Sequence, residues 1–152
     1  MTAVTRFDRH RDEVLRWNRQ MSLVSRVDPE PRVDALVREC RAAWTLLRAA
    51  GVGDAAPEAT VWIDLGSGAG FPGVVWAIER EHEGGIAAPG KGLLVEPREK
   101  RAWFLNRCLR TLDLEHTSVL TARWGGGPAV LDLGDPREAI VSLKAIRLTD
   151  GE

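Results

Sequence analysis

The sequence has few cysteines and no long apolar segment. Its two cysteines, Cys40 and Cys108, lie in predicted helices without a Cys-x-x-Cys pair or a nearby histidine cluster. We therefore expect two ordinary buried thiols and no metal site. No apolar run approaches the ~20 residues needed to cross a bilayer, and residues 2–20 are too charged for a signal peptide. These absences favour a cytoplasmic protein with no membrane segment.

The chain also lacks a strong excess of either charge. Its formal net charge is −1, although residues 1–50 carry ten arginines against seven acidic residues. A strongly basic domain would indicate nucleic-acid binding, and this chain does not have that composition. A solvated helix face explains the N-terminal excess best, but a local arginine patch is still compatible with an RNA substrate.

Strands and helices alternate along most of the chain. The length of 152 residues and the 44% hydrophobic content fit a single domain, with a helical segment at 1–55 packed on a core at 56–152. Periodicity predicts helices and strands, and their alternation predicts an α/β fold with a parallel sheet. The predicted helices are 3–21, 31–50, 74–83 and 98–112, and the predicted strands are 61–65, 92–96, 118–122 and 139–143.

The most informative stretch is 61–73, Val-Trp-Ile-Asp-Leu-Gly-Ser-Gly-Ala-Gly-Phe-Pro-Gly. It is typical of a buried strand that leads into a glycine-rich turn and then a helix. Glycines at 66, 68 and 70 let backbone N–H groups approach a ligand, and Pro72 is expected in the first helical turn. Parallel sheets bind ligands at the carboxyl ends of their strands, where this turn would lie.

The spacing of the glycines favours one ligand class. A dinucleotide fingerprint has Gly-x-Gly-x-x-Gly and an acid about 20 residues on, whereas here the third glycine comes one residue early. The next acid at a strand end, Glu96, follows about 30 residues after the turn. Gly-x-Gly-x-Gly after Asp64 is more typical of an S-adenosylmethionine (SAM) site, and a nicotinamide dehydrogenase ranks last.

The aromatic and histidine residues suggest packing more than chemistry. We expect His10, His82 and His116 at the surface and without a catalytic role. Most of the six tryptophans fall at core positions, including Trp103, which we expect to face inward. Trp124 is the exception, because it follows the third strand and could stack on a planar ligand such as adenine.

Two blocks resemble the bacterial 16S ribosomal RNA guanine-N7 methyltransferases, the glucose-inhibited division protein B family. They are the run from Asp64 to Gly73 and the run 93–105, Leu-Leu-Val-Glu-Pro-Arg-Glu-Lys-Arg-Ala-Trp-Phe-Leu. The segment 17–23, Trp-Asn-Arg-Gln-Met-Ser-Leu, is similar to the family's Trp-Asn-x-x-x-Asn-Leu. The resemblance covers nearly the whole chain and implies a Rossmann-like SAM-dependent methyltransferase with two N-terminal helices, acting on ribosomal RNA or the small subunit.

The resemblance also assigns roles to residues. Asp64 would hold the methionine ammonium of SAM, the turn would contact its carboxylate, and Glu96 would accept from the ribose hydroxyls. For Glu96, a solvent-facing carboxylate paired with Lys100 is the alternative. Lys144 and Arg123 are the candidates for steering guanine or phosphate. The expected cofactor contacts are Asp64, Gly66, Ser67, Gly68, Gly70, Phe71, Glu96, Trp124 and Gly125.

The chain departs from the family in three places. Gly125 replaces an acidic residue, Lys144 replaces an arginine and so loses its planar fork, and 36–40 reads Leu-Val-Arg-Glu-Cys where the family has His-x-x-Asp-Ser. The family also continues through further strands, so we expect a sheet that lacks the last of them. We expect either a truncated relative or a partner chain, including a second copy, over the open edge.

Three functions stay open at this point. Methyl transfer to guanine N7 needs no general base, because N7 has an in-plane lone pair, and proximity can supply much of the catalysis. That agrees with the lack of a convincing acid/base pair. A SAM-binding module that works with a partner or as a scaffold is the first alternative, and methylation of a small molecule is the second.

Overall fold

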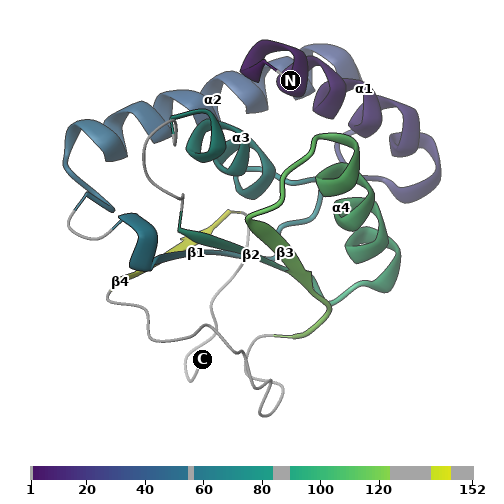
Figure 1. Cartoon of the computed structure of the whole chain (residues 1–152). Helices are drawn as coiled ribbons and strands as arrows, with labels where there is room; N and C mark the ends of the chain where they lie inside the picture. Colours follow the sequence, from purple (N-terminus) through teal and green to yellow (C-terminus); the bar gives the residue numbers. More distant parts are fainter. Residues whose placement is uncertain (1, 55–56, 84–89, 124–137, 145–152) are drawn as a thin grey trace, which may run out of the picture.

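The computed structural model describes residues 2–54, 57–83, 90–123 and 138–144. In chain order these form the elements that Figure 1 labels. They are α1 (Ala3–Met21), α2 (Pro29–Ala49), the 3-10 turn η1 (Pro57–Ala59), β1 (Thr60–Leu65), α3 (Gly73–Glu83), β2 (Lys91–Val95), α4 (Glu99–Thr111), β3 (Thr117–Leu120) and β4 (Glu138–Leu143).

The four strands form one parallel sheet in the order β3-β2-β1-β4. β1 is central and all six of its residues are buried, as expected for an apolar strand with neighbours on both sides. The chain builds outward from β1 through β2 to β3 and then returns to place β4 on the other side of β1. The direction of strand order therefore reverses at β1.

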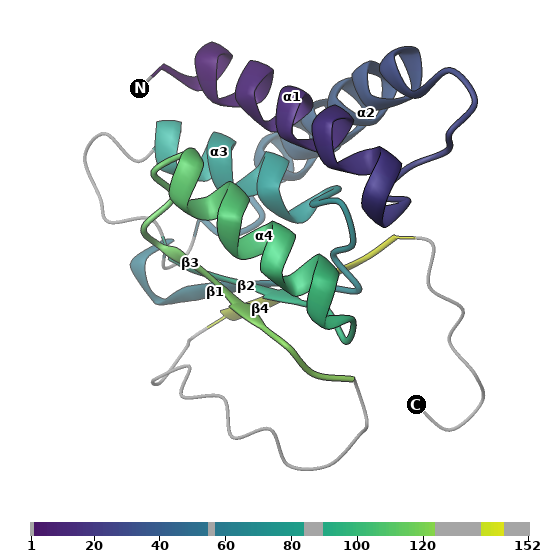
Figure 2. The same ribbon diagram turned by 90° about the vertical axis from the view of Figure 1, so that its right-hand side faces the viewer.

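The helices form two layers over one face of this sheet, as Figures 1 and 2 show. α3 and α4 lie next to the strands, and α1 and α2 cover them from outside. One apolar cluster joins all four helices, with Val14, Val33, Ile78 and Phe104 among its fully buried members. The two N-terminal helices thus contribute to the same core as the helices that follow the strands.

The opposite face of the sheet has its own apolar cluster of strand residues. It comprises Val61, Ile63, Leu65, Leu93 and Val95. Next to these, Val141 and Leu143 of β4 are exposed. In the described part of the chain, no helix is long and apolar enough to span a membrane.

The predicted α/β, Rossmann-like architecture is confirmed, and each predicted element end lies within two residues of the observed one. Two details were wrong. α3 begins at Gly73, so Pro72 precedes the helix and its carbonyl accepts the N–H of Trp76. Trp103 is exposed, because it lies on the solvent edge of α4, one residue before the buried Phe104.

Candidate functional site at the carboxyl end of β1

The glycine-rich turn lies where the strand order reverses. It follows the carboxyl end of β1, which is flanked by β2 on one side and β4 on the other. In open parallel sheets the crevice at such a reversal is the usual ligand site, because the connections leave the strands in opposite directions. The predicted site residues Asp64, Glu96 and Lys144 therefore all lie at the carboxyl ends of their strands.

The turn uses the conformational freedom of its glycines. Gly66, Gly68 and Gly70 all have positive φ angles, of 71°, 55° and 89°. The N–H groups of Gly66 and Ser67 both donate to the carbonyl of Val95, at 2.7 and 3.1 Å. The turn is thereby fastened to the end of β2.

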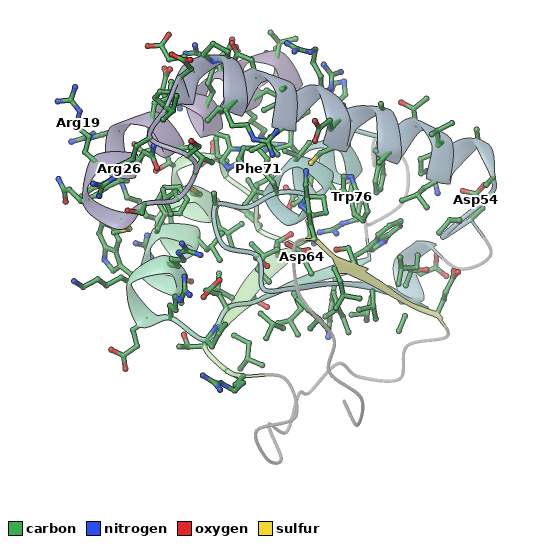
Figure 3. All side chains as sticks on the ribbon, turned by 180° about the vertical axis from the view of Figure 1, so that it is seen from behind. Arg19, Arg26, Asp54, Asp64, Phe71 and Trp76 are labelled. Atoms are coloured by element: carbon green, nitrogen blue, oxygen red, sulfur yellow. The ribbon has the colours of Figure 1, made fainter. Side chains whose placement is uncertain are left out.

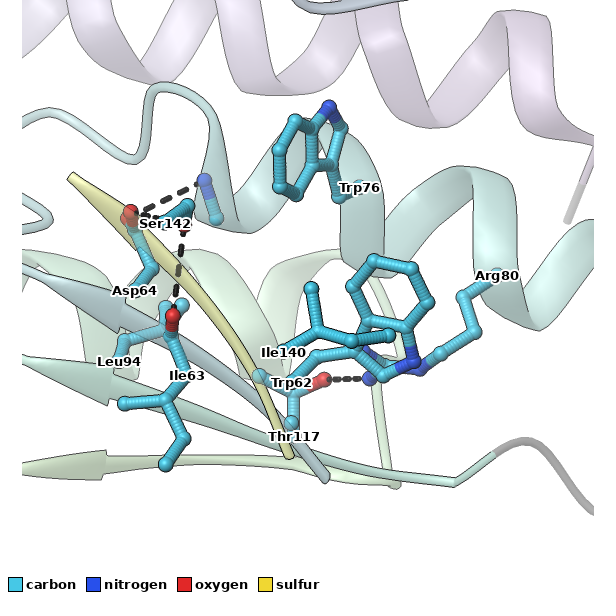
Figure 4. A pocket seen from close by; sticks show the side chains of 11 residues that line it. Trp62, Ile63, Asp64, Trp76, Arg80, Leu94, Thr117, Ile140 and Ser142 are labelled. Carbon is cyan, nitrogen blue, oxygen red and sulfur yellow. Dashed lines mark hydrogen bonds between the residues drawn. The ribbon is translucent and has the colours of Figure 1, made fainter. Parts of the chain in front are cut away.

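Asp64 is buried at the end of β1 and bonded on both oxygens. Its Oδ2 accepts the N–H of Gly73 at 3.2 Å, and its Oδ1 accepts the hydroxyl of Ser142 at 2.7 Å (Figure 4). Burial raises the pKa of this carboxyl, and the bonds from Ser142 and Gly73 oppose that rise. Asp64 therefore joins β1, the start of α3 and β4.

Glu96 is also buried, with only 3% of the residue exposed. One carboxylate oxygen accepts the N–H of Gly68 and the other accepts the N–H of Arg98, both at 3.0 Å. The alternative of a solvent-facing carboxylate paired with Lys100 is therefore wrong. The acid that follows β2 and the centre of the turn form one bonded unit.

His10 reaches the turn from α1 and is fully buried, so its expected surface position was wrong. Its Nε2–H donates to the carbonyl of Ala69 at 3.0 Å, and its ring lies 5.0 Å from that of Phe71. Nδ1 is buried without a partner among the described residues. Burial lowers the pKa of His10 to about 4, so the ring is neutral at physiological pH.

Arg101 lies beside the open side of the turn. Its Nη2 donates to the carbonyl of Ser22, just after α1, at 2.9 Å. A methyl group placed on Gly68 would lie 3.7 Å from Nη1 of Arg101. Burial and the nearby charge of Arg98 lower the pKa of Arg101. A guanidinium is thus held close to the turn.

The two predicted steering residues lie on opposite edges of the described sheet. Lys144 follows β4, and its Nζ is 3.2 Å from a carboxylate oxygen of Glu39 on α2. Arg123 is exposed and follows β3. Three strand spacings separate β3 from β4, about 14 Å, so the two cations reach the carboxyl end of the sheet from opposite sides. Trp124 and Gly125 lie outside the described residues.

A small cavity lies between α3 and the sheet, with Asp64 and Ser142 in its lining (Figure 4). Its volume of about 10 Å³ suits one water molecule and excludes a nucleoside. The buried Arg80 lines it and donates to the hydroxyl of Thr117 at 2.7 Å. Burial lowers the pKa of Arg80 to about 10. This cavity between α3 and the strands is too small to be the ligand site.

Figure 3 shows Asp64 and Phe71 from behind, between the strands and the outer helices. Beside them the sequence reasoning missed Ser142, His10 and Arg101. His10 carried a usable signal, because it comes three residues after Phe7 and four before Val14, both buried on α1. The contacts of Ser142 and Arg101 depend on tertiary pairing and had no comparable signal.

Comparison with known families agrees with this geometry. The GidB family, described as rRNA small subunit methyltransferase G, matches residues 4–141. The chain belongs to this family. Among relatives named ribosomal RNA small subunit methyltransferase G, the one from Bradyrhizobium sp. (strain ORS 278) is 34% identical over 127 residues, covering 80% of this chain and 51% of the relative.

Two further relatives with the same printed name extend the comparison. The one from Roseiflexus sp. (strain RS-1) is 36% identical over 79% of this chain and 45% of its own length. The one from Caulobacter vibrioides (strain NA1000 / CB15N) is 51% identical over 59 residues, 39% of this chain and 26% of the relative. This member of the GidB family spans about half the length of the relatives that it matches over most of its own sequence.

Proposed function

We propose that this chain binds SAM at the turn after β1 and supports methyl transfer to N7 of a guanine in small-subunit ribosomal RNA. Membership of the GidB family and the printed name of the relatives support this function. The observation that carries it is the bonded unit of Glu96 and Gly68 at the reversal of strand order. In this unit, a carboxylate that could accept ribose hydroxyls is bonded directly to a turn that could bind an amino-acid carboxylate.

The residues fit the chemical groups of SAM. Glu96 has buried carboxylate oxygens with lone pairs beyond the two that its backbone donors use, so it would accept from ribose hydroxyls. Asp64 would hold the methionine ammonium, directly or through water, with Gly66, Ser67, Gly68 and Gly70 around the carboxylate. Phe71 would lie along the cofactor, and Trp124 and Gly125 would flank its adenine.

SAM supplies an electrophilic methyl group on a sulfonium. In the reaction the S–CH₃ bond breaks as the N7–CH₃ bond forms, and the positive charge passes from sulfur to the guanine ring. The protein has no proton to remove, so its task is to align N7 with the methyl group. Lys144 and Arg123 would hold guanine or phosphate from opposite edges of the sheet, which an RNA is large enough to span.

The surroundings of the site follow from the same proposal. A protein that acts on ribosomal RNA would work in the cytoplasm. The outer edge of β4, next to the exposed Val141 and Leu143, would pair with a further strand or a partner chain.

Cofactor binding and methyl transfer test the proposal separately. Calorimetric titration should give micromolar SAM affinity for the wild type and much weaker binding for Gly68→Ala, because the added methyl would narrow the ligand's approach to the turn. That methyl meets only ordinary contacts, so the variant should fold. Unchanged affinity in Gly68→Ala would contradict the site.

Tritiated SAM incubated with small ribosomal subunits or with a metabolite extract then identifies the acceptor. Label in ribosomal RNA supports the proposed enzyme. SAM binding without any transfer indicates the binding module instead, and label only in the extract indicates a small-molecule methyltransferase.

A further inference from the structure

We propose that a surface beside the turn binds single-stranded RNA by stacking a base on Trp103 and contacting phosphates with neighbouring cations. We call it the Trp103 face and define it by Arg16 and Trp17 of α1 and by Lys100, Trp103 and Arg107 of α4. The inference rests on the proposed ribosomal RNA substrate, and it names where the RNA would run beyond the methylated guanine.

Trp103 is the unusual residue of α4. The residue is 44% exposed, although its helix contributes Ala102, Phe104, Leu105 and Cys108 to the core. Its ring and that of Trp17 form a T-shaped pair, with centroids 4.9 Å apart and planes at 76°. Because this contact braces the indole while nearly half of the residue stays exposed, the ring would have little freedom to lose when a base stacks on it.

Cations surround this aromatic pair. The guanidinium carbons of Arg16 and Arg107 lie 5.8 and 5.6 Å from the centroid of Trp17. The side chain of Arg16 on α1 is 67% exposed, and Lys100 on α4 is also exposed. Stacking aromatics interleaved with cations is the arrangement that binds single strands without reading a fixed sequence.

The acidic residues of the same turns reduce this positive charge without reversing it. Glu13 is buried and accepts two bonds from Arg107, at 2.6 and 3.2 Å, which fixes that guanidinium beside Trp17. Glu13 also lies 3.9 Å from Arg16, so Arg16, Lys100 and Arg107 exceed Glu13 and Glu99 by one positive charge. Asp12 lies 3.6 Å from Arg11, and Glu99 is exposed at the start of α4. A second copy of the chain would bring the arginines of two such faces together, so charge favours an RNA occupant.

The Trp103 face is continuous with the turn through Arg101. This residue follows Lys100 on α4 and bonds the carbonyl of Ser22 where α1 ends. Arg26 also bonds the hydroxyl of Ser22, at 3.0 Å, and Figure 3 shows Arg19 and Arg26 together at this outer end of the helices. A strand with its guanine at the turn would therefore pass these cations on its way to Trp103.

RNA affinity of the Trp103 variants tests this inference. The probe is a fluorescein-labelled, unstructured RNA of about 12 nucleotides, within the range of known single-strand sites. Fluorescence anisotropy should show about tenfold weaker binding for Trp103→Ala and nearly wild-type binding for Trp103→Phe, because phenylalanine keeps a stacking face. Leu46→Ala is the matched control, since Leu46 is a large exposed apolar residue on α2.

Salt dependence tests the cations. Arg16→Gln should reduce the slope of log affinity against log salt by about 0.7, the value for one phosphate contact on a single strand. Lys91→Gln removes one exposed charge at the start of β2, the opposite end of the strands from the turn, and should leave the slope unchanged.

The outcomes separate this inference from the proposed function. If the wild type binds SAM but Trp103→Ala binds RNA as well as Leu46→Ala does, the RNA contact is overturned and the cofactor site stands. Absence of RNA binding by the wild type overturns it too, as does a dimer that Trp103→Ala dissociates. Failure of the wild type to bind SAM instead counts against the proposed function.

Discussion

The turn after β1 and the residues around its rim differ in how they are held. Beside the turn, Asp64 and Glu96 are buried and each accepts two bonds from the protein. On the rim, Lys144 forms one partly exposed ion pair, and Arg123 and Trp103 are exposed. The buried groups can keep a small ligand in a fixed geometry, whereas exposed cations can adjust to a large and varied one. The proposed cofactor site is therefore rigid, whereas the cations of the proposed RNA surface can adjust.

Acid should have the largest effect on the turn, and it should act through His10. The pKa of His10 is lowered to about 4 by burial, so below pH 6.5 the unfolded chain takes up a proton that the folded chain refuses. Above pH 6.5 this effect is absent. As pH falls from 6.5 toward 4, the free energy of unfolding should decrease by about 3 kcal/mol. Urea unfolding at a series of pH values measures the loss.

His10→Gln isolates the contribution of the histidine. Glutamine can still donate to the carbonyl of Ala69 but does not titrate, so this variant should have a shallower dependence of unfolding free energy on pH. His116→Gln, at an exposed histidine, is the control and should keep the wild-type dependence. Equal slopes for His10→Gln and the wild type would show that protonation of His10 is not coupled to folding.

The next largest effect should come from the close packing behind the turn. A Cβ at Gly73 would overlap the carboxylate of Asp64 and the side chain of Leu94. Gly73→Ala should therefore lower the free energy of unfolding by about 2 kcal/mol. At Gly68 a Cβ has room but the φ of 55° is strained, so Gly68→Ala should cost about 1 kcal/mol. Urea midpoints measure both, and the reverse order would refute this account of the packing.

Asp64→Asn should separate stability from cofactor binding. The raised pKa of Asp64 means that its ionisation lowers the free energy of unfolding, so the stability of the variant should increase relative to the wild type as pH rises above 4. At pH 7 the two should differ by about 1 kcal/mol or less in unfolding free energy. SAM affinity should nevertheless fall about tenfold, because the ammonium loses its counter-charge. Calorimetry showing full affinity would remove Asp64 from the cofactor contacts.

The smallest stability effect is expected on the rim. Lys144→Ala removes a partly exposed ion pair with Glu39 and should change the unfolding free energy by less than about 0.5 kcal/mol. Methyl transfer to small subunits should fall in Lys144→Ala. Glu39→Gln breaks the same ion pair but keeps the cation, so its activity should stay near the wild-type level. Equal losses in the two variants would indicate that the ion pair matters and not the lysine charge.

The sequence predicted the elements and the turn because both depend on local pattern. Buried strands, helical periodicity and glycine spacing act within a few residues, and the parallel sheet follows from their alternation. Apart from Pro72, which precedes α3, the errors concern which side of a helix one residue faces. His10 lies on the buried stripe of α1, where polarity argued against it, and Trp103 is exposed although its size argued for burial.

The site contacts that the sequence did not reveal are long-range. Ser142 meets Asp64 only because β4 pairs with β1, and Arg101 meets Ser22 only because α4 packs beside α1. Tertiary packing sets these pairs, and no spacing rule joins residues 78 or 79 positions apart. The cofactor contacts themselves stay predictions until binding is measured.

The bond from Gly68 to Glu96 has a consequence for how ligands would be distinguished. Glu96 would bind the adenosine half of the ligand and the turn would bind its amino-acid half. Because the N–H of Gly68 joins these two parts of the protein, binding of one half would strengthen binding of the other. Adenosine and methionine offered separately would then each bind more weakly than their share of the affinity of the intact molecule. The site would therefore bind the joined nucleoside and amino acid in preference to free adenosine or free methionine.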